Sequence, residues 1–425
     1  MATKTIRIGC IGVGPRGRGL MKKMLKIPGV KIIGLYDPKP DALKNALADC
    51  KELGFPKVKA YSSSEEMFAD DKIDAVVIAT SWAGHVPLAT AAMKAGKAVG
   101  MEVGPAMCIQ DCYKLVQVQE ETGMPFMFLE NACYGRDELL AINMIKEGLF
   151  GEIIHVTAGY QHCVTDLIYK EYKAMNSGVP GNERILNRMK RNMEPYPTHG
   201  LGPVAKGIGI NRGNRILTLS AMATKARGLN AYIEKTHGKE EASNFVPLAQ
   251  GDVVTTMMKC ANGETIMLTW NTGLPAPATR SIKFHGTNGM YHGDLKSVHI
   301  DGMTKPDPAR PSTKIFESQE NYLKKYTHPG WKWFDKNKLC EKYGINTAGH
   351  GDMDLLTLVS FVECLKNGYD MPIDVYDAAT WMAVSVLVEE SLALGGQPVF
   401  MPDFTGGKWL RRGELNIDKR WDCGV

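Results

Sequence analysis

One short segment of the chain combines side chains that can transfer protons. Residues 196–202 read Tyr-Pro-Thr-His-Gly-Leu-Gly. A free imidazole titrates near neutral pH, so a histidine in this segment, His199, is a candidate general acid or base. Pro197 stiffens the approach to His199, and the glycines at 200 and 202 let other backbone come close. The segment predicts a rigid, partly exposed turn with an acid–base role for His199. The alternative is a structural histidine at the start of a helix.

A glycine-rich turn near the N-terminus predicts a dinucleotide site. Gly12, Gly14 and Gly17 follow an apolar run and precede a helical stretch. The first glycine permits the tight turn, the second lets backbone approach a pyrophosphate, and the third permits close packing of helix on strand. The helix N-terminus offers free N–H groups and the positive end of its dipole to phosphates. Arg16 lies in this turn and is a further candidate cofactor contact. The alternative is an ordinary glycine-rich connection.

A carboxylate follows at the distance that ribose recognition requires. Residues 31–36 predict a second strand, and Asp37 comes at its end, twenty residues after Gly17. There a carboxylate can accept hydrogen bonds from both ribose hydroxyls, and it would repel the 2′-phosphate of NADP. The expected cofactor is therefore NAD.

The ends of the next strands supply further candidate contacts to the cofactor. Three apolar runs predict buried parallel strands, at residues 74–80, 97–102 and 126–131. Ligands bind at the carboxyl ends of such strands, so we expect Glu102, Val103 and Asn131 beside the nicotinamide. The loop after the first run adds three candidates for contact with the adenine-side ribose or the nicotinamide: Ser81, Trp82 and His85.

The hydrophobic pattern predicts an α/β fold in two domains. Alternating strands and helices over 1–135 predict a Rossmann domain with a doubly wound parallel sheet. Residues 136–425 predict an α+β substrate domain with an open, mainly antiparallel sheet. Its expected strands are 152–160, 217–225, 253–260, 264–271 and 280–285, with a hairpin turn at Asn262-Gly263. Helices are expected at 137–146, 352–366 and 375–393, the last two packing back on the first domain. Residues 169–196 predict a long active-site loop and 302–350 an irregular segment.

The strand and loop layout resembles the Gfo/Idh/MocA oxidoreductase family over essentially the whole chain. In that family the strand exit that reads Glu102-Val103-Gly-Pro here is typically Glu-Lys-Pro. The lysine of that motif assists proton transfer at the oxidised carbon. The chain has Val103 in its place, which disfavours a simple sugar or inositol dehydrogenase.

Several unusual strings are similar to the NAD-dependent glycosidases of glycoside hydrolase family 109. They occur in the expected order along the chain and include Gly159-Tyr-Gln-His162, Tyr196-Pro-Thr-His-Gly200, Lys225-Ala-Arg-Gly228, Gly349-His-Gly351 and Asp374-Val-Tyr-Asp377. The resemblance implies transient oxidation of a sugar at C3, loss of the C2 hydrogen, departure of the C1 substituent, addition of water and reduction of the ketone. The net reaction is hydrolysis, by a route unlike that of glycosidases with two carboxylates.

The resemblance also implies roles for individual residues. It places His199 opposite the nicotinamide and gives Tyr160 a role in substrate contact or as a base. It implies substrate contacts for Arg184, Tyr196, Pro197 and Thr198. For Tyr196 the alternative is plain packing, and around Arg184 the segment matches the family poorly. His162 shares the strand face of Tyr160, and His350 between two glycines is a candidate cofactor contact or part of a helix-entry loop.

The sugar is less well defined than the reaction. Family members commonly carry an aromatic residue after the proline near Pro277, where this chain has Ala278. An α-N-acetylgalactosaminide or a related glycoside is expected as substrate, and the loss of this aromatic contact bears on that choice. The divergent segment 169–193 bears on the choice of sugar as well.

Composition excludes several other classes of protein. Lysine and arginine number 51 against 46 acidic residues, without a long basic cluster, so no nucleic-acid partner is expected. No apolar run reaches membrane-spanning length, so no membrane partner is expected either. The first strand begins too early for a signal peptide, which predicts a cytoplasmic protein. The ten cysteines lack metal-ligand spacing and predict reduced thiols, mostly buried, with no metal site.

Two rival functions follow from the same residues. A net dehydrogenase of this fold would release a 3-keto sugar and NADH, whereas a glycosidase retains its cofactor through turnover. A non-catalytic sensor of sugar or NAD is disfavoured by the acid–base candidates Tyr160 and His199. By analogy with such folds, a homo-oligomer is expected.

Overall fold

The computed structural model describes residues 4–177, 183–246, 248–344 and 351–425. Contacts divide the chain into two compact units: residues 1–140, 326–379 and 412–424 form the first, and residues 141–325, 380–411 and 425 form the second. The chain passes between the units within helices, including α6 (Arg136–Lys146) and α16 (Val375–Ala393). The boundary expected near residue 135 stays a prediction.

A six-stranded parallel sheet forms the centre of the first unit, in the order β3-β2-β1-β4-β5-β6. The strands are β1 (Ile6–Ile11), β2 (Val30–Tyr36), β3 (Lys59–Ala60), β4 (Ala75–Ile78), β5 (Ala98–Met101) and β6 (Phe126–Phe128). β4, β5 and β6 are buried along their whole length, as expected for strands covered on both faces. This is the doubly wound order that the sequence predicts, so the Rossmann prediction is confirmed.

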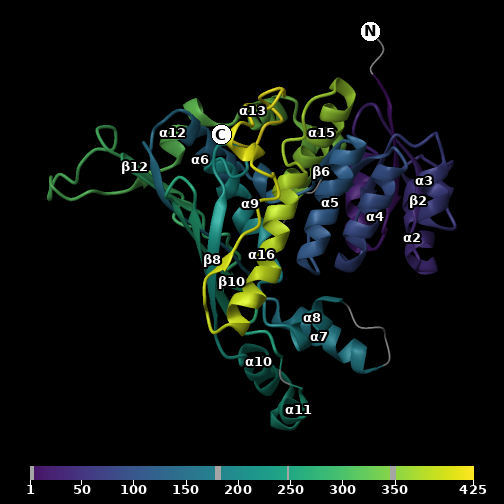
Figure 1. The fold of residues 1–425 in the computed structure, drawn as a ribbon, viewed down its shortest axis with the longest axis horizontal. Helices are drawn as coiled ribbons and strands as arrows, with labels where there is room; N and C mark the ends of the chain where they lie inside the picture. Colours follow the sequence, from purple (N-terminus) through teal and green to yellow (C-terminus); the bar gives the residue numbers. More distant parts are fainter. Residues whose placement is uncertain (1–3, 178–182, 247, 345–350) are drawn as a thin grey trace. The chain divides into compact units, whose positions relative to one another are not determined.

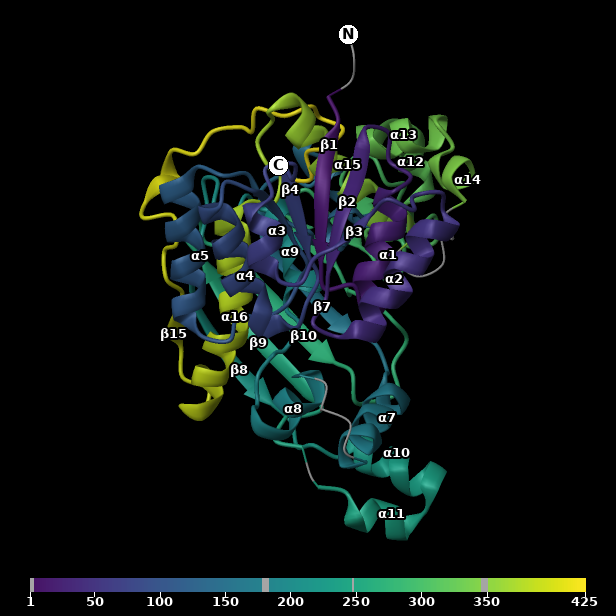
Figure 2. The ribbon, with the colours of Figure 1, turned by 90° about the vertical axis from the view of Figure 1, so that its right-hand side faces the viewer.

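Helices cover both faces of this sheet. Figure 2 shows α1 and α2 on one side of the strands and α4 and α5 on the other. The helices are α1 (Pro15–Met24), α2 (Pro40–Glu52), α3 (Ser64–Ala69), α4 (Trp82–Lys94), α5 (Ile109–Thr122), α13 (Pro329–Lys336), α14 (Leu339–Tyr343) and α15 (Gly351–Asn367). A 3-10 turn, η1, spans Asn131–Tyr134. The expected helix at 352–366 is confirmed as α15, which is buried over most of its length and packs on α1 and η1.

The second unit is built on a nine-stranded sheet in the order β14-β13-β12-β11-β7-β10-β9-β8-β15. The strands are β7 (Ile153–Gln161), β8 (Ile216–Ala223), β9 (Val253–Cys260), β10 (Thr265–Asn271), β11 (Lys283–Gly286), β12 (Gly289–His292), β13 (Ser297–Ile300), β14 (Glu317–Ser318) and β15 (Val399–Phe400). Only β7 and β10 pair in parallel, and the other pairs are antiparallel. The expected mainly antiparallel sheet and the hairpin between β9 and β10 are confirmed.

Alternation along the strands separates a buried face from an exposed one. In β9, Val254, Thr256 and Met258 are buried, whereas Met257 and Lys259 between and after them are exposed. The expected helix at 375–393 is confirmed as α16, and Figure 1 shows it along β8. Its Ser391 hydroxyl accepts a hydrogen bond of 3.0 Å from the backbone N–H of Ala221 in β8.

Two segments expected to be irregular contain helices. Within 169–196 lie the end of α7 (Thr165–Asn176) and all of α8 (Glu183–Lys190). Their apolar side chains form a small core with α10 (Gly228–His237) and α11 (Lys239–Asn244): Ile168, Tyr169, Tyr172, Ile185, Leu229, Ile233, Ala242 and Phe245. Figure 2 shows these four helices beside one another. The loop prediction was wrong because the many charges masked an apolar residue on every turn.

The second wrong prediction concerns residues 302–350. β14, α13, α14 and α12 (Glu320–Tyr326) all lie there, and residues 345–350 are outside the described chain. In α13, Trp331 and Phe334 are buried and their rings pack edge to face. Three prolines near residue 308 suggested irregularity, but the apolar spacing that makes these helices begins only after them.

The described chain also bears on metal and membrane association. All ten cysteines are free, and among the described residues no cluster of histidine, cysteine or acidic side chains is arranged to hold a metal ion. None of the helices in those residues has both the length and the apolar composition of a membrane span.

Candidate functional site

The glycine turn has the backbone that a dinucleotide loop requires. Gly12 has a φ of +81°, and a Cβ there would lie 2.6 Å from the carbonyl oxygen of Ala79. A Cβ on Gly17 would lie 1.9 Å from the carbonyl oxygen of Gly12, so only glycine lets α1 start this close to the turn. A Cβ on Gly14 would meet no atom within 4 Å, which leaves its surface open to a ligand.

The start of α1 offers its N–H groups without competition from its own side chains. Gly14 occupies the cap position, Pro15 follows it, and within the described chain no acidic residue lies in the first turn of α1. The positive end of the helix is therefore available to an anion such as a pyrophosphate. The residues present fit the dinucleotide that the sequence predicts.

Asp37 lies immediately after β2, where ribose recognition is expected. Its carboxylate accepts hydrogen bonds from the backbone N–H of Val13 (2.8 Å) and of Lys39 (2.9 Å). The bond to Val13 fixes Asp37 against the glycine turn. Each carboxylate oxygen can accept a further bond, which suits two ribose hydroxyls.

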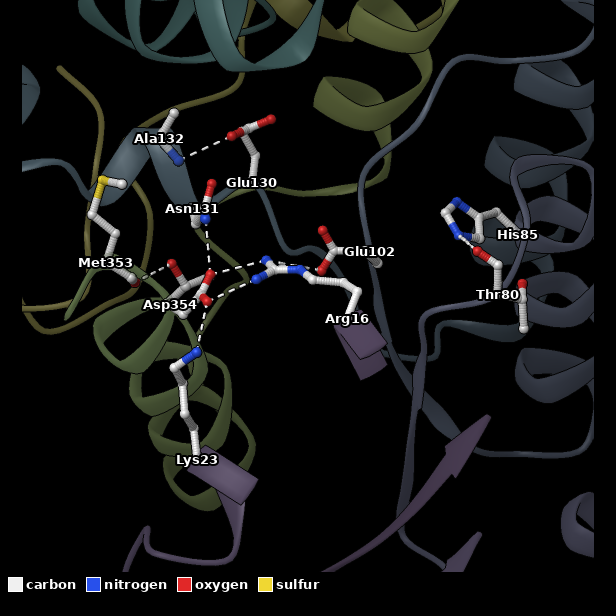
Figure 3. A network of polar contacts seen from close by, with 11 residues as sticks. Arg16, Lys23, Thr80, His85, Glu102, Glu130, Asn131, Ala132, Met353 and Asp354 are labelled. Atoms are coloured by element: carbon white, nitrogen blue, oxygen red, sulfur yellow. Dashed lines mark hydrogen bonds and ion pairs between the residues drawn. The ribbon is translucent and has the colours of Figure 1, made fainter. Parts of the chain in front are cut away.

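Arg16 is held by a carboxylate that the sequence did not single out. Its guanidinium donates to both oxygens of Asp354 in α15, at 2.7 and 2.9 Å, although the two residues are 338 apart in the chain. Asp354 also accepts bonds from Asn131 Nδ2 (2.8 Å) and Lys23 Nζ (2.9 Å). Figure 3 shows Arg16 extending between Asp354 and Glu102, whose nearest oxygen is 3.3 Å from the guanidinium. Arg16, Glu102 and Asn131, predicted separately, are thus brought together around Asp354.

Burial gives the acids of this network different electrostatic properties. Burial is the main influence on Glu102 and raises the pKa of its carboxyl, against the charge of Arg16. For Asp354 burial again acts to raise the pKa, but the bonds and charges of Arg16 and Lys23 outweigh it and hold the pKa below its usual range. Asp354 is therefore the ionised partner of Arg16. Glu102 is the group at this strand exit that is more easily protonated.

The start of α4, which follows β4, contacts the segment after Glu102 at the end of β5. Trp82 is buried against Gly104, where an added Cβ would lie 2.4 Å from the indole Cδ1. Val103 is buried beside them, and Ser81 is exposed at the start of α4. Two of the predicted cofactor residues, Trp82 and Val103, are thus both buried next to Gly104 in the first unit.

His85 is buried in the first turn of α4 and remains neutral. Its Nε2 lies 3.2 Å from the carbonyl oxygen of Thr80. Burial lowers its pKa from the ordinary 6.5 to about 4. Since the unfolded chain then binds the proton more readily than the folded one, this residue makes stability fall as the pH drops from about 6.5 toward 4. A neutral imidazole can offer a ligand a hydrogen bond without adding charge.

The acid–base candidates of the second unit form one aromatic cluster. The ring centroids of Tyr196 and His199 are 4.7 Å apart, those of Tyr160 and His199 are 5.4 Å apart, and those of Tyr160 and Tyr196 are 5.3 Å apart. His199 is 5% exposed, whereas both tyrosines are half-buried. Residues 36 and 39 positions apart in sequence therefore meet in one cluster of rings.

Two glycines in contact position this cluster. His199 is the second residue of α9 (Thr198–Gly207), and Gly200 follows it. A Cβ on Gly200 would lie 2.7 Å from the backbone nitrogen of Gly159 and 2.8 Å from its oxygen. The absence of both side chains lets α9 lie directly on β7. Because Tyr160 follows Gly159, this close approach brings His199 to Tyr160.

The remaining sequence candidates are less uniform. Arg184 lies over the ring of Tyr196, 5.5 Å from its centroid. The ring of His162 is 6.5 Å from that of Tyr160. Pro197 caps α9, and the fully buried Thr198 hydroxyl has no hydrogen-bond partner in the described chain. His350 lies outside the described residues. The functional roles of these residues stay predictions.

One residue beside the cluster was missed by sequence reasoning. Arg188 in α8 stacks on Trp270, with 4.9 Å between the guanidinium carbon and the ring centroid, and donates to Thr272 Oγ1 at 2.8 Å. Trp270 pairs with Tyr160 in the parallel register of β10 and β7, so Arg188 lies beside the acid–base cluster. The segment had been interpreted as a loop, which hid the helical spacing of Arg184 and Arg188.

Matches to family models agree with both units. Residues 6–129 match the model described as "Oxidoreductase family, NAD-binding Rossmann fold". Residues 134–411 match the one described as "Glycosyl hydrolase 109, C-terminal domain". The fold and the glycine turn therefore define a protein with an NAD-binding domain of the Gfo/Idh/MocA type. Within that class, the chain belongs to glycosyl hydrolase family 109.

Curated relatives support this membership over nearly the full chain. An alpha-N-acetylgalactosaminidase of Tannerella forsythia is 38% identical over 96% of this chain and 88% of its own length. A glycosyl hydrolase family 109 protein of Stenotrophomonas maltophilia is also 38% identical, over 96% of this chain and 91% of its own length. The resemblance read from the motifs is confirmed, and the protein is an enzyme of this family.

Solved structures support the fold. A levoglucosan dehydrogenase in complex with NADH and L-sorbose gives a TM-score of 0.66 at 18% identity, covering 95% of this chain and all of the other. The scyllo-inositol dehydrogenase of Lactobacillus casei with NAD(H) and scyllo-inositol gives 0.62 at 16% identity, covering 94% and 99%. At such identity the likeness shows the shared architecture.

Proposed function

We propose that this NAD-dependent glycosidase acts by transient oxidation of its sugar at C3, with Tyr160, Tyr196 and His199 handling the protons. The observation that carries the proposal is the contact of these three rings in a chain whose glycine turn fits a dinucleotide. When bound, NAD⁺ supplies reversible oxidation of the C3 alcohol, taking two electrons with the carbon-bound hydrogen and later returning them.

The chain's own residues account for the remaining proton transfers. One base accepts the C3 hydroxyl proton. The resulting ketone acidifies the neighbouring C2–H, and a second transfer removes that proton while the C1–O bond breaks and a C1–C2 double bond forms. The departing oxygen takes up a proton, water adds at C1, and C2 regains a proton. When the ketone is reduced, the base returns the first proton to the C3 oxygen. Tyr160 and His199 lie close enough to serve one sugar ring, and imidazole can exchange protons at neutral pH.

Val103 explains why these groups must act. A valine side chain cannot carry a proton, and it occupies the strand exit where dehydrogenases of the wider family have lysine. The burden of acid–base chemistry therefore moves to the aromatic cluster of the second unit. Arg184, over the ring of Tyr196, is the proposed substrate-binding residue beside it.

Hydrolysis in heavy water tests this route. The released sugar is expected to carry deuterium at C2, because that hydrogen passes to a base that exchanges with solvent. Mass spectrometry and proton NMR of the product measure the label, and the same sugar incubated with enzyme after release is the control for later exchange. A hydrolysed product without deuterium at C2 would exclude the elimination.

The solved sugar dehydrogenases of this architecture suggest a second candidate function, net oxidation of the sugar. A net dehydrogenase would produce NADH in proportion to substrate, visible as rising absorbance at 340 nm. The glycosidase is expected to turn over many substrates with no such rise. As substrate we propose α-N-acetylgalactosaminides or related glycosides, by similarity to the relative named for that activity.

We infer a cytoplasmic location from the thiol chemistry. All ten cysteines are free and most are buried, as expected of a protein that resides in a reducing compartment.

We also infer a homo-oligomer formed through the exposed face of the nine-stranded sheet. Phe400, Met222 and Met257 are 82%, 66% and 43% exposed on neighbouring strands of that face. Exposed apolar side chains on one sheet face favour association with a second copy. Sedimentation velocity is expected to give a multiple of the 46.7 kDa chain mass. Phe400→Lys should shift it to the monomer, and a monomeric wild type would refute the interface.

A further inference from the structure

Two arginines one turn apart project from α8 toward the aromatic cluster. Arg184 lies over Tyr196, and Arg188 lies over Trp270. Like charges four residues apart destabilise a helix, and α8 is only eight residues long. The two arginines therefore lower the stability of α8, which points to a function for the pair.

Among the described residues, most of the donors of Arg188 have no acceptor. A guanidinium has five N–H groups, and in the described chain Arg188 makes one side-chain hydrogen bond, to Thr272 Oγ1. It has no ion pair with a carboxylate there. The acids that act on it electrostatically are Glu171 and Asp252. Oδ2 of Asp252 already accepts the backbone N–H groups of Arg227 and Gly228 at the start of α10.

The electrostatic balance at Arg188 is correspondingly unfavourable. Burial, followed by the charge of Arg184, lowers the pKa of Arg188 to about 10. A cation in such a place gains from an anion that approaches it. The guanidinium carbon lies 4.9 Å from the ring centroid of Trp270, and Tyr160 is the register partner of Trp270. The N–H groups of Arg188 that have no acceptor among the described residues are thus held next to the proposed sugar site.

We infer that the substrate carries an anionic group, a carboxylate or a sulfate, which Arg188 binds beside Tyr160. Both groups present paired oxygens that match the planar fork of a guanidinium. This inference rests on the proposed function, because it names the class of glycoside that the same site accepts. It adds Arg188 as a residue that determines specificity.

Matched pairs of nitrophenyl glycosides test the inference. Each pair differs only at C6, with a hydroxymethyl group in one member and a carboxylate or a 6-sulfate in the other. The wild-type enzyme is expected to favour one anionic member by on the order of 10- to 100-fold in kcat/KM, the worth of a charge-assisted bidentate contact. The carboxylate and sulfate arms identify which anion is preferred. A preference for the neutral member in every pair would overturn the inference.

Variants of α8 then assign the preference. Arg188→Gln should collapse the ratio of anionic to neutral kcat/KM toward one, mainly through KM, and Arg188→Lys should keep part of it because the charge remains. Lys190→Gln is the matched control, since it removes one positive charge from an exposed position of the same helix and should leave the ratio unchanged. An equal loss on both substrates in Arg188→Gln would show a structural role and refute the assignment.

Direct binding separates this inference from the proposed reaction. Calorimetric titration with free hexuronate, hexose 6-sulfate and hexose needs no turnover. Tighter binding of one anionic sugar, weakened by Arg188→Gln and by added salt, would support the anionic site even if no glycoside were hydrolysed. Hydrolysis of neutral glycosides, with no difference in binding among the three sugars, would overturn the anionic site and leave the glycosidase function standing.

Discussion

Replacing His199 by alanine is expected to lower kcat by about 10²–10⁴ while the protein keeps its fold and its NAD. The range is that of losing a positioned general acid or base. His199 packs against Tyr160 and Tyr196 in the second unit, whereas the glycine turn and Asp37 lie in the first. Turnover, bound NAD and the thermal midpoint should be measured on one preparation of the variant.

His285→Ala provides the comparison for this variant. His285 is an exposed histidine on β11 and is expected to tolerate the change in all three measurements. A structural role for His199 would give the reverse of the expected pattern, with a lowered midpoint, less retained NAD and nearly normal kcat in the folded fraction. Near-normal kcat would remove His199 from the mechanism.

Replacing Gly17 by alanine is expected to weaken NAD binding by about 10- to 100-fold. The new Cβ would lie 1.9 Å from the carbonyl oxygen of Gly12, so either α1 or the turn must move. Overpacking of this kind costs about 1–3 kcal/mol, and each 1.4 kcal/mol of lost binding energy is a factor of ten in affinity. Fluorescence titration with NADH measures the affinity, and thermal unfolding measures the accompanying loss of stability.

Gly19→Ala is a matched control two residues further along α1. A Cβ on Gly19 would meet no atom within 4 Å. Alanine inside a helix is favoured over glycine by about 0.5–1 kcal/mol, so this variant should be slightly more stable and bind NADH normally. If both variants bound NADH like the wild type, the glycine turn would not be the dinucleotide loop.

Much of the fold could be predicted because its signals are local. The glycine turn with flanking apolar runs defines β1, α1 and β2, and the Asn262-Gly263 turn defines the hairpin of β9 and β10. The helical segments α7 and α8 were missed because charged residues are interspersed among their apolar ones. Their apolar side chains are buried only against α10 and α11, which follow tens of residues later.

Site residues that directly follow a strand could be predicted from the sequence. Site residues that depend on a contact with a distant part of the chain could not. Glu102 and Asn131 could be placed because they follow strands of a parallel sheet. Asp354 could not, since its contact with Arg16 joins α15 to α1 across most of the chain. Arg188 could not be predicted for a related reason. Its position near Tyr160 depends on the cross-strand pairing that puts Trp270 next to Tyr160.

The contact of Gly159 with Gly200 has a consequence for how this enzyme could change its substrate. The spacing between Tyr160 and His199 is set by direct contact between the backbones of Gly159 and Gly200, which have no side chains to separate them. The residues that we propose to select the sugar lie elsewhere, among them the arginines of α8. Recognition can therefore be altered by redesigning α8 without disturbing the proton-transfer pair. The backbone contact that positions Tyr160 and His199 and the proposed sugar-selecting residues of α8 are separate parts of the structure. The protein is therefore a suitable starting point for engineering new glycoside preferences.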